Sequence, residues 1–389
     1  MARNIRGTWI AAVLLAVGLV AAACGSASTT STAAKSASKS STSPTSSTAS
    51  SSSSTGVTVE TPPSASLTET GSTLLYPLWN IWAPAYEQKY PQVHLTTAGT
   101  GSGTGISDAA TGTVDIGSSD AYLSTSQKAA HPTLLNIPLG ISVQVIGYNL
   151  PGVTAHVKFN GKILAQIYEG KITSWSAPAL KAINPGLTLP DIPIVPLHRS
   201  DGSGDTFIFT QYLSKQTPGG WGTNVKYGTT VTWPSVSGAL AEQGNGGMVT
   251  GCKKTTGCIA YVGISYLSQL LGDGLYYGEL MNGSGNYVLP TSSAVAAEAN
   301  YFTAKTPADG TISLINGPVP TGYPIINYEY AIVNTQQSSA STAKAIRSIL
   351  EWAITPDNGN SSKYLSQVSF QPLPPKVVAQ SVKQIAQIK

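Results

Sequence analysis

The sequence predicts an α/β protein whose strands pair largely in parallel, and two observations lead to this prediction. After residue 67, short apolar strand patterns alternate with longer helical patterns, which is typical of parallel sheets flanked by helices. Clusters of Gly, Pro, Ser and Thr separate these segments and indicate the turns between them. The chain of 389 residues is long enough for two ordinary domains with a sizeable core.

The individual elements follow from the spacing of apolar residues, at three or four residues for helices and in short continuous runs for buried strands. The expected helices are Pro77–Lys89 (interrupted at Pro84), Ile106–Thr111, Gly161–Tyr168, Ala177–Ile183, Thr206–Ser214 and Ala343–Ala353. The expected strands are Val93–Thr97, Val114–Gly117, Ile141–Asn149, Ile194–Leu197, Ile259–Val262 and Ile325–Val333.

Two of the strand patterns, Ile141–Asn149 and Ile325–Val333, bracket the middle of the chain. If both strands cross between two lobes, the first lobe contains residues 67–148 and 327–389, and the second contains residues 149–326. We therefore expect two lobes, each with a mixed, mostly parallel sheet flanked by helices.

The N-terminus has the pattern of an export signal. Arg3 and Arg6 precede the uncharged aliphatic stretch Trp9–Ala23, which is shorter than the roughly 20 residues of a membrane-spanning helix. Three alanines then precede Cys24, and this order resembles the bacterial lipobox. We expect residues 1–23 to be a signal peptide and Cys24 to be lipidated, with ordinary secretion and cleavage nearby as the alternative.

Residues 24–66 are expected to form a disordered linker behind that lipidated cysteine. Ser and Thr dominate this segment, and it carries few charges and little apolar surface, too little to offset the entropy lost on ordering. The sequence therefore predicts a folded unit tethered to the extracytoplasmic face of the cell membrane.

Composition excludes several classes of protein. The net charge of +4 comes without basic runs, so we expect no nucleic-acid partner. The four His residues have no metal-ligand spacing and the Cys residues number only three, so we expect no metal site and no disulfide-rich scaffold.

Cys252 and Cys258 enclose a short loop with Gly beside each of them, and in an exported protein we expect them to form a disulfide.

Four turns rich in Gly, Ser and Thr recur along the chain: Glu69–Leu74, Gly99–Gly105, Gly117–Ala121 and Arg199–Thr206. Three of them precede a helical pattern, where unpaired N–H groups and the helix dipole attract oxyanions. A single such turn is typical of an ordinary helix cap. Four of them, with Arg199 available for a bidentate contact, favour one shared anion site.

The familiar phosphate and nucleophile motifs of enzymes are absent. The run Gly99–Gly105 does not fit G-x-G-x-x-G, and the chain contains no G-x-x-x-x-G-K-[ST] and no G-x-S-x-G. His198 could serve as a base, but it precedes Arg199 on a predicted strand, where neighbouring side chains point to opposite faces. We therefore expect a binding site rather than a catalytic one, and no cofactor.

Several stretches carry a resemblance to a known family, and Arg199–Thr206 is the most specific of them. The others are Glu69–Leu78, Gly99–Leu123, the Cys252–Cys258 loop and Gly322–Val333. Together they resemble the phosphate-binding protein of bacterial phosphate ABC transporters (the PstS family), in particular its actinobacterial lipoprotein branch. The resemblance implies a two-lobed, class II periplasmic-binding-protein fold that closes over phosphate in the cleft between its lobes.

The resemblance also implies a role for each site residue. The phosphate-binding residues would be Thr73, Leu74, Ser102, Asp120, Arg199, Ser203, Gly204 and Asp205. Thr73 would donate its hydroxyl, Leu74 its backbone N–H, and Ser102 both kinds of group, whereas Asp120 would accept a proton of the ligand. Arg199 would clamp two oxygens, oriented by Asp201, while Ser203, Gly204 and Asp205 present the start of the next helix. Many family members have Thr or Ser where Asp205 stands.

The function implied by the resemblance is capture of inorganic phosphate, by a monomer, for the permease subunits of a membrane ABC transporter. Two alternatives stay open: a phosphoryl-transfer or phosphatase enzyme with the same oxyanion cradle, and a surface antigen or adhesin whose phosphate site is vestigial. Phosphate retains a proton near neutral pH and sulfate does not, so buried carboxylates favour phosphate over other oxyanions. With acceptors at Asp120 and Asp205, we expect phosphate affinity to hold or rise as pH falls toward about 5–6.

Overall fold

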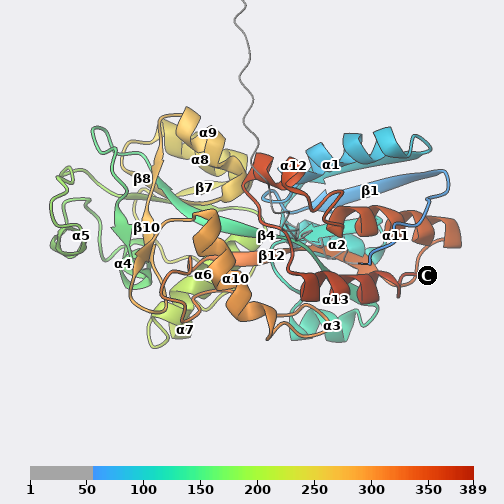
Figure 1. The fold of residues 1–389 in the computed structure, drawn as a ribbon. Helices are drawn as coiled ribbons and strands as arrows, with labels where there is room; N and C mark the ends of the chain where they lie inside the picture. The colour runs from blue at the N-terminus through green and yellow to red at the C-terminus, as the bar shows by residue number, and fades with distance from the viewer. Residues whose placement is uncertain (1–55) are drawn as a thin grey trace, which may run out of the picture. The chain divides into compact units, whose positions relative to one another are not determined.

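The structure is a computed structural model, and it describes residues 56–389 (Figure 1). The predicted signal peptide, the lipidated Cys24 and the linker up to residue 55 lie outside these described residues. The described residues 56–389 belong to one compact unit. Within residues 56–389, no helix combines the length and the apolar character needed to span a membrane.

Most strands of the described chain belong to one mixed sheet. The strands, in chain order, are β1 (Ala65–Gly71), β2 (Val93–Gly99), β3 (Ile116–Ser119), β4 (Leu134–Tyr148), β5 (Lys158–Phe159), β6 (Val195–Arg199), β7 (Leu240–Glu242), β8 (Cys258–Gly263), β9 (Tyr276–Tyr277), β10 (Glu279–Met281), β11 (Tyr287–Val288) and β12 (Ile326–Asn334). The large sheet has the order β2-β1-β3-β12-β4-β8-β6-β7, with β9 beside β4, and a small sheet has the order β11-β10-β5.

Helices cover the sheet and connect its strands. The α-helices are α1 (Tyr76–Lys89), α2 (Ser102–Thr111), α3 (Thr125–Ala130), α4 (Gly161–Tyr168), α5 (Pro178–Ile183), α6 (Gly204–Gln216), α7 (Trp221–Asn224), α8 (Gly244–Lys254), α9 (Leu267–Gly272), α10 (Ser292–Thr303), α11 (Ala340–Ile354), α12 (Ser362–Leu365) and α13 (Pro375–Ile385). Two short 3₁₀ helices, η1 (Ile264–Tyr266) and η2 (Ser366–Val368), complete the described elements.

The long strand β4 joins two halves of the sheet. Its first part pairs antiparallel with β12, and its last part pairs antiparallel with β8. On the β12 side, β1 is parallel to both β2 and β3; on the β8 side, β6 is parallel to both β7 and β8. Figure 1 shows β4 and β12 between the helices of the two halves. The predicted lobe boundaries at residues 148 and 326 stay a prediction, since the described residues belong to one compact unit.

Strand β4 begins earlier than predicted, at Leu134 rather than Ile141. Pro138 and Gly140 interrupt the apolar pattern there and lower the strand signal. The pairing with β12 accommodates them through a β-bulge in β4, because Glu329 pairs with Gly140 and Tyr330 with Pro138, which leaves Leu139 unpaired. Almost every residue of β4 is buried, so this strand forms the centre of the core.

An aromatic cluster anchors α1 against α11. The rings of Trp82 and Trp352 meet edge to face at 6.5 Å, and those of Tyr86 and Trp352 at 5.6 Å; such pairs add about 0.5–1.5 kcal/mol to simple burial. The predicted interruption of this helix at Pro84 does not occur, because α1 runs from Tyr76 to Lys89 with Pro84 on its exposed face.

The folded chain starts before the predicted end of the linker at Ser66. The backbone N–H of Glu60 donates to Glu351 Oε2 at 2.7 Å, and its carboxylate pairs with Arg347 Nε at 3.0 Å. Strand β1 then begins at Ala65. Residues around Glu60 therefore belong to the folded unit, since helix α11 supplies partners for both their backbone and their side chains.

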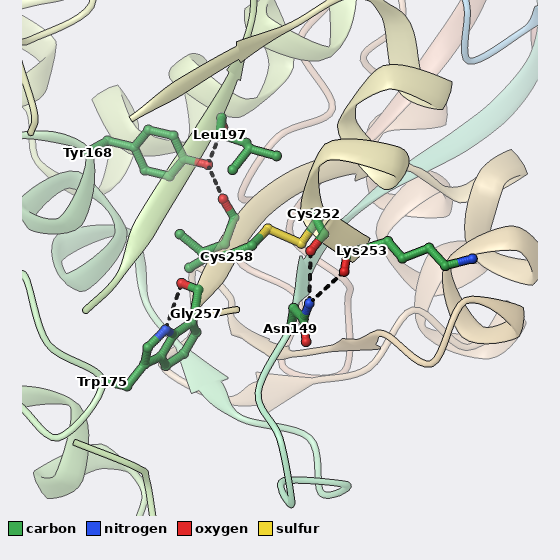
Figure 2. Close-up of a disulfide and its surroundings, with 9 residues drawn as sticks. Asn149, Tyr168, Trp175, Leu197, Cys252, Lys253, Gly257 and Cys258 are labelled. Carbon is green, nitrogen blue, oxygen red and sulfur yellow. Dashed lines mark hydrogen bonds between the residues drawn. A yellow bond between two sulfur atoms is a disulfide. The ribbon is translucent and has the colours of Figure 1, made fainter. Parts of the chain in front are cut away.

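A disulfide between Cys252 and Cys258 closes the turn from α8 to β8, as the sequence predicted (Figure 2). The two Cα atoms lie 5.3 Å apart. Asn149 secures the end of α8, because its side-chain Nδ2 donates to the carbonyl oxygens of Cys252 and Lys253 at 3.0 and 3.1 Å. The disulfide thus fixes the C-terminal end of α8, opposite to the end that begins at Gly244.

Candidate anion-binding site

The predicted site residues converge at the carboxyl ends of parallel strands. Thr73 and Leu74 follow β1, Ser102 is the first residue of α2 after β2, and Asp120 follows β3. Arg199 is the last residue of β6. Ligands of α/β proteins bind outside the carboxyl ends of strands, so the strands of both halves direct these residues toward one region.

Arg199 is the central cation of this region. Its side chain is buried, and its Nε donates to Asp201 Oδ1 at 2.7 Å while its Nη2 pairs with the other oxygen of Asp201. Its Nη1 donates to Asp205 Oδ2 at 2.8 Å. The backbone N–H of Arg199 donates to the Tyr261 hydroxyl at 2.8 Å. Asp201 therefore lies where the sequence placed it, with a bidentate contact that fixes the plane of the guanidinium.

Asp205 is engaged more fully by the protein than the sequence suggested. Besides Arg199, its Oδ2 accepts from Asn245 Nδ2 at 2.7 Å, and its Oδ1 accepts from Gln144 Nε2 at 3.2 Å. Both oxygens thus have protein donors. Asp205 therefore anchors Arg199, and its predicted contact with a ligand stays a prediction.

Asp120 receives hydroxyl donors from its own half of the molecule. The Ser72 hydroxyl donates to Oδ1, and the Ser102 hydroxyl lies 3.3 Å from Oδ2. The start of α6 comes directly against this carboxylate, because a Cβ at Gly204 would lie 2.5 Å from Asp120 Oδ2 and 2.6 Å from Ser102 Oγ. A residue without a side chain is thus required at position 204 for the two halves to meet here.

The starts of helices provide backbone N–H donors near the site. Ser203 caps α6 by accepting the N–H of Thr206 at 3.2 Å, so the N–H groups of Gly204 and Asp205 have no acceptor within their helix. The N–H of Leu74, predicted as a ligand donor, instead donates to Ser72 Oγ at 3.1 Å.

Thr73 also lies at the site, in a contact that the sequence did not indicate. Its Oγ1 accepts from the side-chain Nδ2 of Asn245 at 3.0 Å and from the backbone N–H of Asn245 at 3.2 Å. The hydroxyl proton of Thr73 thus remains available, and its donation to a ligand stays a prediction.

Burial controls the protonation of the site. It raises the pKa of Asp120 to about 7, and the neighbouring Asp205 adds to this effect. Burial also raises the pKa of Asp205, although Arg199 opposes the change. For Asp201 the guanidinium of Arg199 outweighs burial and lowers the pKa. The two aspartates beside Arg199 in turn outweigh its burial and keep its pKa above the usual value, so the site retains a permanent positive group.

Besides Gln144, the contributors Ser72, Asn245 and Glu329 were not predicted. Ser72 lies within the predicted turn Glu69–Leu74, but its contact with Asp120 joins distant segments. Asn245 is fully buried at the start of α8 and touches Thr73, Asp205 and Gly263. The sequence contained one indication that Glu329 has a special role, since it is the single acidic residue within the apolar strand β12.

The remaining polar groups do not indicate another chemistry. His198 stacks on Trp233 with ring centroids 4.8 Å apart, and its Nδ1 lies 3.2 Å from the carbonyl oxygen of Arg199. Within residues 56–389, no group of three His, Cys, Asp or Glu side chains is placed to hold a metal ion.

The fold and the buried site at the strand ends define an α/β binding protein of the periplasmic type. A family model described as a PBP superfamily domain matches residues 29–357. A crystal structure of the phosphate-binding protein from Stenotrophomonas maltophilia shares the fold, with a TM-score of 0.62, 20% sequence identity and coverage of 82% of this chain and 93% of that one. The predicted class of fold is therefore confirmed.

Sequence relatives specify the family within that class. The phosphate-binding protein PstS of Xylella fastidiosa is 32% identical over 327 residues, which cover 82% of this chain and 86% of the relative. The phosphate-binding protein PstS 3 of Mycobacterium leprae is 28% identical over 323 residues, which cover 79% of this chain and 83% of the relative. The chain belongs to the PstS family. The identities do not favour a mycobacterial branch over a proteobacterial one.

Proposed function

We propose that this protein is an extracytoplasmic receptor that captures inorganic phosphate at the Arg199–Asp120 site and delivers it to the permease of a phosphate ABC transporter. The observation that carries the proposal is the buried guanidinium of Arg199, which faces the start of α6 with Asp120 beside it. Fixed N–H donors and a positive charge suit a tetrahedral oxyanion. The carboxylate of Asp120 suits an oxyanion that carries a proton.

The charges of the site support a protonated ligand. Asp120, Asp201 and Asp205 surround the single cation Arg199. A fully deprotonated oxyanion would meet these buried negative charges without a proton to offer, and an unpaired buried acceptor costs about 1–3 kcal/mol or more. Phosphate and arsenate can supply that proton, whereas sulfate cannot. Rejection of the unprotonated competitor thus determines the specificity.

Direct binding distinguishes the proposal from its alternatives. Equilibrium dialysis with labelled inorganic phosphate should show tight uptake that arsenate reduces and excess sulfate does not. Failure to bind phosphate, or equal competition by sulfate, would overturn the proposal. Release of product from a chromogenic phosphate ester would instead favour the phosphatase alternative, and tight phosphate binding argues against an adhesin with a vestigial site.

We also propose that the two halves of the sheet act as lobes that close on phosphate. Three contacts that cross between the halves support this. The N–H of Gly103 donates to the carbonyl oxygen of Gly202 at 2.8 Å, the Ser265 hydroxyl donates to the carbonyl oxygen of Leu74 at 2.7 Å, and Asn245 donates to Thr73. Such contacts favour the closed state, which a permease can then recognise.

We also propose that Cys24 carries a lipid that anchors the protein to the membrane, and that the chain belongs to the actinobacterial branch of the family. The order of three alanines and Cys24, and the aspartate at position 205, support them. Cys24→Ser should move the protein from the membrane fraction to the soluble extracytoplasmic fraction, whereas a Ser28→Ala control should stay with the membrane. Equal membrane retention of both variants would contradict lipidation at Cys24.

Asn245→Ala is expected to weaken phosphate binding by about tenfold to a hundredfold. The substitution removes a donor from both Thr73 and Asp205, and leaving buried acceptors unpaired costs about 1–3 kcal/mol. Isothermal titration calorimetry measures the change. Asn286→Ala, at an exposed asparagine, is the matched control, and equal affinity of the two variants would refute a role for Asn245.

Phosphate affinity is expected to hold or rise between about pH 8 and about pH 5.5. The pKa of Asp120 without ligand is about 7, and a bound anion beside it makes a shared proton harder to remove. The complex therefore binds protons more tightly than its separated components, so affinity increases as pH falls through that pKa and then levels off. Calorimetry in buffers of different ionisation enthalpy should show proton uptake near pH 8, and much weaker binding at low pH would contradict this.

A further inference from the structure

Glu329 is a buried acid directly behind the proposed phosphate site. It lies in β12 with an exposed fraction of 0%. Its Oε1 accepts from the Ser142 hydroxyl and from Asn327 Nδ2 at 3.1 Å. Its Oε2 has no nitrogen or hydroxyl donor among residues 56–389, and its carboxyl group is hydrogen-bonded to that of Asp120.

A hydrogen bond between two carboxyl groups requires one proton, because two carboxylates at contact repel each other. The surroundings decide which residue holds it. Asp120 faces the cation Arg199 and receives the Ser72 hydroxyl, although Asp205 opposes its ionisation. Within residues 56–389, the groups that act on Glu329 are Asp120, Ser142 and Asn327, and none of them is a cation. The buried phenol of Tyr330 also lies nearby. Burial and the Asp120 charge raise the pKa of Glu329 well above its ordinary value.

We propose that Glu329 is a specificity-determining positioning residue: it keeps its proton and donates it to Asp120, so that Asp120 remains an acceptor toward the ligand. Asn327 supports this pairing, since its Nδ2 lies 3.1 Å from Glu329 Oε1 and 3.2 Å from the carbonyl oxygen of Asp120. The inference deepens the proposed function and rests on it for the identity of the ligand.

The pairing explains how a buried aspartate beside an anion site keeps its negative charge. Without the donor behind it, Asp120 would take up a proton more readily and would itself become a donor. A site with a donor at position 120 no longer repels sulfate. Glu329 thus acts on selectivity through Asp120 without touching the ligand.

The test follows the Asp120 carboxyl group in the full chain without ligand, by ¹³C NMR titration. Loss of the signal in Asp120→Asn assigns the resonance. Glu329→Gln keeps a neutral donor of the same shape, so the Asp120 titration should stay within about half a pH unit of the parent. Glu329→Leu removes the donor and should raise the Asp120 pKa by about one pH unit or more.

A matched control is available in Glu298. This glutamate is also fully buried, and burial raises its pKa to about 7, but it accepts from the N–H of Gly317 rather than contacting Asp120. Glu298→Gln should therefore leave the Asp120 titration unchanged. Sulfate competition against labelled phosphate, at about pH 9 where Asp120 is ionised in the parent, should increase about tenfold in Glu329→Leu and stay at the parental level in Glu329→Gln and Glu298→Gln.

Two results would overturn the inference. If Glu329→Gln lowers the Asp120 pKa by about one pH unit or more, Glu329 is an anion in the parent. If folded Glu329→Leu leaves both the titration and the sulfate competition unchanged, Glu329 is only structural. If Glu329→Leu fails to fold, the Asp120 pKa measured in Glu329→Gln decides whether Glu329 is protonated in the parent. Absence of phosphate binding by the parent would refute the proposed function, while the titration of Asp120 would still decide the pairing.

Discussion

Arg199→Met is expected to abolish high-affinity phosphate binding and to lower the free energy of unfolding by about 3–5 kcal/mol. The methionine retains much of the side-chain volume but removes the charge. Asp201 and Asp205, which both pair with the guanidinium, would then be buried without their cation. Loss of a buried charged contact to the ligand costs a further 2–5 kcal/mol or so of binding free energy.

Urea denaturation and calorimetry separate the two effects. Arg199→Lys keeps a charge but cannot make the bidentate contact with Asp201, so we expect intermediate stability and strongly weakened binding. In the double variant Arg199→Met with Asp205→Asn, stability should partly recover because one uncompensated charge is removed, whereas binding should not. Phosphate affinity of Arg199→Met within tenfold of the parent would show that the guanidinium does not contact the ligand.

The helices with regular apolar spacing were the most predictable part of the fold. Gly161–Tyr168 was predicted with its observed bounds, because its apolar face is regular and Asn160 caps it by accepting the N–H of Ile163 at 2.8 Å. Helix α8, by contrast, was not predicted, since its sequence is rich in glycine. Tertiary contacts favour this helix. Glu242 lies so close to Gly251 that a Cβ there would be 2.4 Å from Glu242 Oε1, and the disulfide of Cys252 holds the C-terminal end of α8.

Strand β1 shows a second limit of pattern-based prediction. Its residues alternate without a continuous apolar run, and Glu69 and Thr70 are buried polar residues within it. The strand forms because β2 and β3 pair with it on both sides in parallel register. Such pairing between distant segments is not encoded in local periodicity, so the sequence of β1 resembles that of a loop.

The site was predictable where its contacts are local and not where they are distant. Asp201 follows Arg199 by two residues, so its ion pair could be expected from the motif itself, whereas the ion pair of Asp205 with Arg199 was not predicted. The contact of Asn245 with Thr73 joins residues 172 positions apart, and that of Gln144 with Asp205 joins residues 61 positions apart. Only the folded chain brings these amides to the site.

Asp120→Asn is expected to weaken phosphate binding and to admit sulfate. The amide has the shape of the carboxyl group, so the hydroxyl groups of Ser72 and Ser102 keep a partner. Phosphate loses an acceptor for its proton, at a cost of about 1–3 kcal/mol. Sulfate no longer meets a buried negative charge and gains an N–H donor, so the preference for phosphate, which we expect to be about a thousandfold in the parent, should fall by at least tenfold.

The pH dependence distinguishes this mechanism from a loss of packing. In the parent, sulfate should begin to compete only as pH falls below about 7, where Asp120 itself becomes protonated. In Asp120→Asn that titration is absent, so sulfate competition should be nearly independent of pH. Asp357→Asn makes the same change at an exposed aspartate and should retain the parental profile. If Asp120→Asn rejects sulfate as firmly as the parent across the pH range, discrimination must arise elsewhere, and Arg199 with the N–H groups at the start of α6 would be the remaining determinants.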